Sequence, residues 1–576
     1  MTNLVETDVL VVGGGPAGGS FAVFLAKHGI APLVILRHES TADTPRAHIT
    51  NQRAMECLRD AGLEAACMEM ASPPDHIAHS FWLRSMVGAE LGRVWSWGSD
   101  PARIGEYRAA SPCVMNDLPQ TYLEPILLTE AQRLGARVRF GWELQSFVQD
   151  ADGVTATVID RAIGEPITIR ARYMIGADGA RSRVIDQLGV PLVGMHGLAN
   201  VFNVLCDIEL GPYVEHRHGS LYSVIQPGSS YWAPVGVFRM VRPWNRWLVA
   251  LIVPVVAGKP EPTLEDFQTR LQELVGDPAI PVKILSTSLW TVNDVYAERY
   301  SVGRVFCIGD AVHRHPPTNG LGSNTCIQDA FNLAWKMAYV LQGKARAALL
   351  DSYDAERQPV GKQIVSRANK SMLQNNYIWD LFGGGTRSET GEADAEAVFA
   401  TPDGRAALAE AAELMRYEYH AHGVEMTRRY QSGALVAETT EEPASPLDPE
   451  LHYVPSTRPG STLPHAWLVQ RHPSPLLSTL DVAGKTRFTL LTGHGGEGWR
   501  QAAAIAGERH GIDIKVVSIG PRLDYEDPYR SWSKLREIDE SGCVLVRPDL
   551  VVAWRCQAVP EDPQEALAAA LARMLG

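Results

Sequence analysis

The sequence predicts an α/β protein: a nucleotide-binding βαβ domain with an inserted mixed β-sheet, a helical connector and a C-terminal α/β domain. Three observations predict this fold class. An apolar strand at residues 7–12 runs into a glycine-rich turn, a helix and a second strand at 32–36. Residues 198–290 are rich in strand-forming and aromatic residues. A second β-α-β pattern begins near residue 488, after an exposed linker at 438–446.

These patterns divide the chain into three expected domains. Residues 1–375 form the nucleotide-binding domain, and the substrate-binding sheet is interleaved with it at about 75–120 and 190–290. The helical connector occupies residues 376–440, where helical spacing dominates. The C-terminal domain spans residues 441–576 and starts within the linker rich in Glu, Thr and Pro.

The composition indicates a globular protein of enzyme size. The chain has 576 residues, 45% hydrophobic and 21% charged, and its net charge of −13 argues against nucleic acid as a partner. The eight cysteines show no C-x-x-C, so we expect reduced, mostly buried thiols in a cytoplasmic protein. No apolar stretch reaches membrane-spanning length, so we expect no membrane partner. We also expect a homo-oligomer that acts on a small molecule.

The first candidate site is Gly13-Gly14-Gly15-Pro16-Ala17-Gly18, directly after the first strand. Gly13 permits a tight turn, Gly15 lets the backbone approach a diphosphate, and Gly18 allows close packing of helix and strand. The diphosphate would lie at the N-terminus of the helix that Pro16 and Ala17 open. One usual part is missing, because the second strand ends in Leu36-Arg37-His38 and offers no acid for ribose hydroxyls.

Two later segments extend this site. Asp178-Gly179 follows a strand, and Gly309-Asp310 ends the apolar strand 305–308, where a carboxylate suits a ribitol hydroxyl. The following loop opens a helix whose first amides can face the pyrimidine edge of a flavin. Since a single nucleotide-binding turn would not need the other two segments, the three in this order predict FAD held across the whole domain. The cofactor candidates added by the later segments are Asp178, Asp310, Pro317, Gly322, Ser323 and Asn324.

With Pro45-Arg46-Ala47-His48 and Asp117-Leu118-Pro119-Gln120, these segments resemble the FAD-dependent aromatic hydroxylases, the class A flavoprotein monooxygenases. The stretches 45–59, 290–335 and 458–467 most resemble the phenol 2-monooxygenase and 2,4-dichlorophenol 6-monooxygenase group. The resemblance covers nearly the whole chain and implies a thioredoxin-like C-terminal domain. Because that domain lacks C-x-x-C, thiol redox activity is not implied.

The resemblance implies a reaction as well. Hydride passes from NADPH or NADH to FAD, reduced flavin reacts with O2, and a C4a-hydroperoxyflavin attacks a ring carbon ortho to an oxygen. We therefore expect an NAD(P)H-dependent monooxygenase that converts a phenol to a catechol. The flavin takes the dinucleotide fingerprint near the N-terminus, so NAD(P)H is expected to bind transiently at the surface. Arg239 and Arg242 are candidates for that contact, with a strand-end salt bridge as the alternative.

A phenol with a pKa of about 10 needs a base to ionise at neutral pH. The resemblance places the substrate hydroxyl at His48, which is our candidate base, and Asp117 is the candidate for orienting its ring and supporting the imidazolium. The alternative for His48 is a loop histidine bonded to backbone. Arg46 and Gln120 are expected on the flavin side, with surface and helix-capping roles as alternatives.

Three other functions stay open at this point. The same scaffold could hydroxylate a larger polycyclic or polyketide phenol. A flavin-binding sensor or electron carrier would leave His48 and Asp117 without a role, and an NAD-linked dehydrogenase would leave Gly309-Asp310 unexplained. A metal pair at His313 and His315 lacks a third ligand in the sequence, so we expect no metal.

Overall fold

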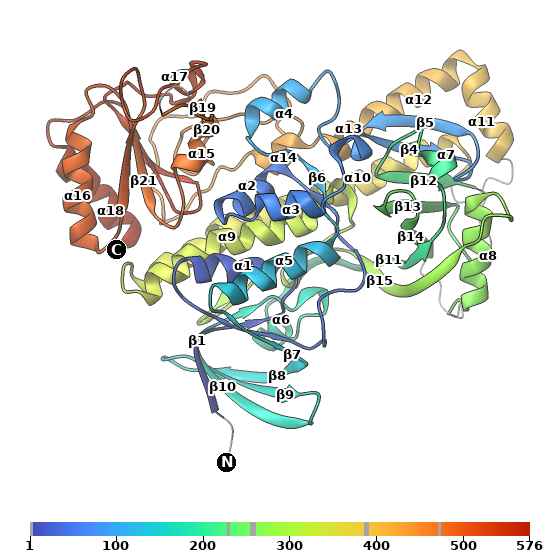
Figure 1. Ribbon diagram of the computed structural model, residues 1–576, viewed down its shortest axis with the longest axis horizontal. Coiled ribbons are helices and arrows are strands. Elements are labelled where there is room, and N and C mark those ends of the chain that lie inside the picture. The colour runs from blue at the N-terminus through green and yellow to red at the C-terminus, as the bar shows by residue number, and fades with distance from the viewer. Residues whose placement is uncertain (1–3, 227–230, 254–260, 385–390, 471–473) are drawn as a thin grey trace.

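The computed structural model describes residues 4–226, 231–253, 261–384, 391–470 and 474–576. Two large sheets and a C-terminal domain surround a group of central helices (Figure 1). The first sheet lies at the bottom of the view, the second at the right and the C-terminal domain at the left. This architecture confirms the fold class expected from the sequence.

The first sheet has the strand order β16-β17-β10-β1-β2-β7, and β8 and β9 extend it from β10. β1 pairs in parallel with β2 and β10, and β10 pairs in parallel with β17. The carboxyl ends of these strands therefore meet at one edge. The strands are β1 (Leu4–Val12), β2 (Leu33–Leu36), β7 (Arg137–Phe140), β8 (Trp142–Gln149), β9 (Val154–Asp160), β10 (Glu165–Gly176), β16 (Ser301–Val302) and β17 (Val305–Cys307).

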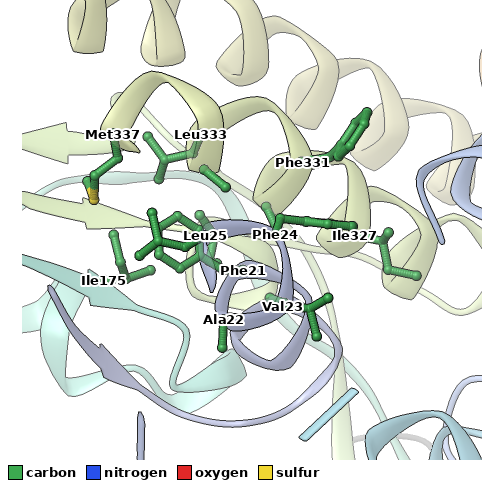
Figure 2. Close-up of a cluster of buried hydrophobic side chains, with 14 of the residues drawn as sticks. Phe21, Ala22, Val23, Phe24, Leu25, Ile175, Ile327, Phe331, Leu333 and Met337 are labelled. Atoms are coloured by element: carbon green, nitrogen blue, oxygen red, sulfur yellow. The ribbon is translucent and has the colours of Figure 1, made fainter. Parts of the chain in front are cut away.

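Two helices cover this sheet and form the core of the domain. α1 (Pro16–Lys27) packs against α9 (Leu321–Leu341), and Figure 2 shows Phe24 of α1 beside Phe331 of α9. Their rings meet edge to face with centroids 4.9 Å apart. Phe21 and Leu25 are fully buried in the same layer. Because each large side chain buried here contributes roughly 1.5–3 kcal/mol, this contact fixes α9 relative to the glycine turn.

The second sheet has the order β18-β15-β11-β14-β13-β12-β4-β5 and is antiparallel except for the β12–β4 pair. Its core contains Trp247, Phe238 and Tyr222, and α8 (Leu264–Val275) covers one face. The strands are β4 (His79–Leu83), β5 (Glu90–Trp95), β11 (Leu192–Asp207), β12 (Leu221–Ile225), β13 (Val235–Arg242), β14 (Arg246–Val253), β15 (Lys283–Ala297) and β18 (His313–Arg314).

Further helices join the two sheets to the end of the chain. α10 (Asp351–Leu381) runs unbroken through residue 375, where we expected the first domain to end. The domain limits at residues 375 and 440 remain a prediction. The other helices of this region are α2 (Gln52–Asp60), α3 (Glu64–Met70), α4 (Ile104–Ala110), α5 (Gln120–Arg133), α6 (Arg183–Leu188), α11 (Gly391–Ala400), α12 (Pro402–Leu414), α13 (Arg416–Tyr419) and α14 (His422–Met426).

The C-terminal domain holds a four-stranded sheet of order β22-β21-β23-β24. β21 (Phe488–Thr492), α16 (Gly498–His510) and β22 (Ile514–Ser518) form a parallel unit, and the hairpin β23 (Cys543–Val546) and β24 (Val552–Cys556) completes the thioredoxin-like arrangement. α18 (Pro563–Leu575) packs beside α16. Phe488 contacts Trp335 and Tyr339 of α9, so the domain docks on the helix that starts at the candidate site.

Candidate active site

The glycine turn is built as the sequence predicts for close packing. Gly13 has a φ of +105°, and a Cβ there would lie 2.2 Å from the carbonyl oxygen of Ala177. A Cβ on Gly18 would lie 2.0 Å from the carbonyl oxygen of Gly13. Both positions therefore require glycine for the turn itself, before any ligand is considered.

Gly15 has a different environment. Within 4 Å of a Cβ built on Gly15, the described residues place only Glu124 Oε1, at 3.6 Å. No side chain among the described residues caps the first turn of α1, where Pro16 is the first residue. Space and uncapped backbone amides at a helix N-terminus are what a diphosphate needs. The turn thus fits the diphosphate of FAD.

The structure brings the three predicted segments together. Ala177, one residue before Asp178, donates its N–H to Val12 at 2.9 Å, and Ile308 donates to Gly176 at 3.0 Å. A Cβ on Gly309 would lie 2.9 Å from the Cβ of Ala17. The segments meet because β1, β10 and β17 are parallel neighbours that end at the same edge.

The two aspartates of these segments differ. The Asp178 carboxylate accepts hydrogen bonds from Ser182 Oγ at 2.5 Å, from the Arg183 N–H at 2.8 Å and from the Val184 N–H at 3.2 Å. It therefore caps α6. Asp310 is exposed, and its carboxylate lies 3.9 Å from the Cys326 thiol. Asp310 thus has acceptor capacity for ribitol hydroxyls, whereas Asp178 is already engaged.

The start of α9 supplies the remaining predicted residues. Gly322 and Ser323 are half-buried in its first turn, and Pro317 is exposed before it. The Asn324 side chain is buried and engaged with backbone: its Nδ2 donates to Ile49 at 2.8 Å, and its Oδ1 accepts from the Asn51 N–H at 2.9 Å. Asn324 thus ties α9 to the segment that follows His48.

His48 and Asp117 form a pair in which Asp117 is fully buried and His48 is half-buried. β3 (Ile49–Thr50) and β6 (Asn116–Asp117) pair with Ile49 opposite Asp117. The His48 Nδ1 lies 2.9 Å from Asp117 Oδ2, and the aspartate side chain is fully buried. Burial and the charge of Arg239 lower the pKa of His48, and Asp117 opposes them. With Nδ1–H donated to Asp117, Nε2 carries the lone pair of a neutral imidazole.

Arg239 lies beside this pair, which corrects its predicted role. We expected a surface arginine, but Arg239 is 5% exposed and its Nη1 donates to the backbone carbonyls of Pro45 and Arg46, the latter at 2.8 Å. A buried residue cannot form part of a surface dinucleotide site. Burial lowers its pKa to about 10, and Asp117 opposes this shift. Arg242 is exposed, and its Nε donates to the Tyr122 hydroxyl at 2.8 Å.

Buried polar atoms at this pair lack a partner. Within the described ranges, they include Nε and Nη2 of Arg239 and Oδ1 of Asp117. Such atoms are costly unless a ligand or water satisfies them. Their position between the second sheet and the three segments fits a polar group of a bound molecule.

Gln120 and Arg46 lie on the glycine-turn side of the pair. Gln120 Nε2 donates to Glu124 Oε1 at 2.5 Å, and the Glu124 Oε2 accepts from the Ala42 N–H at 2.7 Å. Arg46 is exposed, and its charge acts on Glu124. Burial raises the pKa of Glu124, and these partners oppose the shift. Sequence reasoning missed Glu124. Its spacing of four residues from Gln120 was the available signal.

His313 and His315 each have their own partner. His313 Nε2 lies 2.9 Å from Asp329 Oδ2, and His315 Nδ1 faces the carbonyl of Pro316 at 2.6 Å. A different group, Asp75, His76 and His218, has ligand atoms within 4.8 Å of one another. The rings of His76 and His218 also contact Trp244. Sequence reasoning missed this group, because His218 is far in the chain from the adjacent Asp75 and His76.

The geometry defines a flavin-binding fold with an acid–base pair. Residues 6–368 match the family model of the FAD binding domain, and residues 456–576 match that of the aromatic-ring hydroxylase C-terminal domain. The chain belongs to the FAD-dependent aromatic-ring hydroxylases. In the residues that the structure describes, no helix has the length and apolar character needed to cross a membrane.

Relatives of known activity extend over the whole chain. It is 49% identical to a 2,4-dichlorophenol 6-monooxygenase of Delftia acidovorans, covering 99% of this chain and 98% of the relative. It is 43% identical to a phenol 2-monooxygenase of Pseudomonas sp. (strain EST1001), covering 98% and 92%. The crystal structure of the flavin-dependent monooxygenase PieE with FAD and substrate is similar, with a TM-score of 0.94 and 44% identity over 99% of both chains.

Proposed function

We propose that this protein is an NAD(P)H-dependent FAD monooxygenase that hydroxylates a phenolic substrate ortho to its hydroxyl, giving a catechol. The observation that carries the proposal is the His48–Asp117 pair beside the three converging flavin segments. A sensor or electron carrier has no use for a base held by a buried aspartate at this place. The relatives named for dichlorophenol and phenol support a monocyclic phenol as the substrate class.

His48 is the proposed base. The phenol O–H bond breaks, its proton moves to His48 Nε2, and the electron pair stays on the phenolate oxygen, which makes the ring more electron-rich. Asp117 holds the Nδ1–H and supports the imidazolium that forms. FAD, when bound, supplies hydride acceptance from NAD(P)H and the activation of O2.

Arg239 acts on both partners of this proton transfer through its charge, which keeps the resting His48 neutral and would stabilise the phenolate. Its charge opposes protonation of the resting imidazole, so His48 is ready to accept a proton at neutral pH. Its Nε and Nη2 hydrogens have no partner among the described residues and suit a phenolate oxygen. The site thus combines a neutral base, His48, with a cation, Arg239, that would stabilise the phenolate formed when His48 takes the proton.

The cofactor residues are assigned by their surroundings. We propose that Gly13, Gly15 and Gly18 shape the diphosphate turn and that Asp310 binds ribitol hydroxyls. The amides of Gly322 and Ser323 would face the pyrimidine edge of a bound flavin, and Arg46 and Gln120 would complete the flavin side. Arg242 remains a candidate for transient NAD(P)H binding. The protein's use of either NADPH or NADH, its cytoplasmic location and its assembly as a homo-oligomer stay predictions.

A panel of phenols tests the function. The purified yellow protein is incubated with each phenol while NAD(P)H loss, O2 uptake and product mass are followed together. We expect phenol-stimulated NAD(P)H oxidation and a product heavier by one oxygen, with the new hydroxyl ortho. Oxidation without that mass gain on any phenol would contradict the proposal. A gain restricted to polycyclic phenols would favour the larger-substrate alternative.

A further inference from the structure

A cluster of buried charges joins the C-terminal domain to the flavin segments. We call it the interdomain cluster, and each of its side chains belongs to a residue at most 4% exposed. Acids and bases are equal in number, so the buried charge is compensated. The members are Arg53, Glu56, Asp329, Lys336, Glu356, Arg357, Arg547 and Asp549.

Arg547 is the contribution of the C-terminal domain, from the loop after β23. Its Nη1 and Nη2 donate to the two carboxylate oxygens of Glu356 on α10, at 2.6 and 2.9 Å. Asp549 accepts from Arg547 Nε at 2.9 Å and holds the guanidinium plane. Lys336 of α9 donates to Glu356 Oε2 at 2.8 Å. This bidentate pair therefore fixes α10 against both α9 and the C-terminal domain.

Arg357, which follows Glu356 on α10, connects the helix to the flavin segments. Arg357 Nε donates to Asp329 Oδ1 at 2.7 Å. The other oxygen of Asp329 accepts from the Gly309 N–H at 3.1 Å and lies 2.9 Å from His313 Nε2. Gly309 directly precedes Asp310, so Asp329 fixes the turn that presents the proposed ribitol ligand. Glu356 and Arg357 thus connect the C-terminal domain to that turn through one helix.

The buried charges of the interdomain cluster fix the geometry of the side chains that carry them. Burying ion pairs is costly, and apolar side chains of similar volume give comparable stability. What a bidentate pair adds is one defined geometry, since misplacing either partner leaves a buried charge unpaired. In the cluster that geometry extends from Arg547 to the backbone N–H of Gly309.

We propose that Arg547 is a positioning residue for the flavin, so that the C-terminal domain sets the pose and retention of FAD through α10 and the Gly309–Asp310 turn. This inference rests on the FAD site proposed above. It gives the C-terminal domain a role in the reaction although the domain carries no C-x-x-C.

The test compares two buried arginines of the same domain. Arg547→Met breaks the link to Glu356. Arg555→Met is the matched control, because Arg555 is buried on the neighbouring strand and pairs with Glu438 and Glu537, which lie outside α9 and α10. Two readouts follow the flavin in the holoenzyme: the rate of FAD release on dilution, by fluorescence, and the visible circular dichroism of the bound flavin. Far-UV circular dichroism gives the folded fraction.

We expect Arg547→Met to release FAD at least tenfold faster than wild type at an equal folded fraction, with an altered visible spectrum. Arg555→Met should keep both wild-type values. Arg547→Lys keeps the charge and loses the bidentate geometry, so its rate of FAD release should lie between those of Arg547→Met and Arg555→Met. If Arg547→Met does not fold, the comparison of Arg547→Lys with Arg555→Met tests the inference. Equal FAD release in the Arg547 variants and the control would overturn the inference.

Asp310→Ala separates this inference from the site on which it rests. If Asp310→Ala loses FAD while the Arg547 variants retain it normally, only the positioning role is wrong. If Asp310→Ala retains FAD as tightly as wild type, the flavin-site assignment itself fails.

Discussion

The glycine turn and the His48–Asp117 pair lie in the same domain but are built differently. The turn is made of backbone, and two of its glycines, Gly13 and Gly18, stand where a Cβ would lie 2.2 and 2.0 Å from a carbonyl oxygen. The pair is made of two side chains, one from the loop just before β3 and one from β6, and Arg239 is added from the second sheet. The glycine turn, which we call the backbone site, therefore depends on having no side chain at its key positions. The His48–Asp117 pair with Arg239, which we call the side-chain site, depends on segments that are distant in the chain coming together.

The largest expected effect breaks the backbone site. Gly18→Ala places a Cβ 2.0 Å from the Gly13 carbonyl, so we expect a loss of roughly 2–4 kcal/mol in the free energy of unfolding and no FAD-loaded protein. Chemical denaturation and the flavin absorbance measure both.

Gly15→Ala is the matched control for that variant. Its Cβ meets only Glu124, at 3.6 Å, so stability should stay within about 0.5 kcal/mol of wild type while FAD affinity falls. Equal destabilisation by Gly15→Ala and Gly18→Ala would remove the distinction between a packing glycine and a ligand glycine.

The next effect breaks the side-chain site and leaves the backbone site intact. His48→Ala should lower kcat/KM for phenol at neutral pH by about 10²- to 10⁴-fold while FAD binding is unchanged. For nitrophenols, which ionise more readily, kcat/KM of the variant should fall far less. Steady-state product formation across phenols of different acidity measures this. A uniform loss across the series would mean that His48 is not the base.

Arg239 sharpens the comparison, because it acts on the side-chain site from the second sheet. Its charge lowers the pKa of His48, so Arg239→Met should raise that pKa. Activity that needs neutral His48 is lost as pH falls through this pKa. The acidic limb of the kcat/KM profile should therefore move to higher pH, by roughly one unit. Arg239→Lys keeps the charge and should move it less. An unmoved limb in Arg239→Met would refute the electrostatic link.

The smallest expected effect lies outside both sites. Arg242→Ala should raise KM for NAD(P)H by about three- to tenfold, equivalent to roughly 1 kcal/mol, with KM for the phenol unchanged. Tyr122→Phe is the control, because it removes the hydroxyl that Arg242 contacts and keeps the ring. If KM for NAD(P)H does not change in Arg242→Ala, the arginine serves only to pack on Tyr122.

Local chemistry accounts for what could be predicted of the fold and the backbone site. The strand at 7–12, the turn at Gly13–Gly18 and the β-α-β unit after residue 488 rest on periodicity and glycine spacing within short windows. The role of Arg239 was not predictable in this way. An arginine is normally exposed, and Arg239 is buried where the second sheet docks on the Pro45–Arg46 loop.

The sequence by itself determined an α/β fold that binds a flavin, because the glycine turn and the two later segments each carry their chemistry in consecutive residues; the hydroxylase reaction and the role of His48 came from the resemblance to the aromatic hydroxylases. Only the tertiary structure decided which polar groups are already satisfied and which remain for a ligand. It caps α6 with Asp178, leaves Asp310 exposed, places Glu124 under Gly15 and links Arg547 to Gly309. The physical reason is that burial and pairing between distant segments depend on packing, which no local pattern encodes.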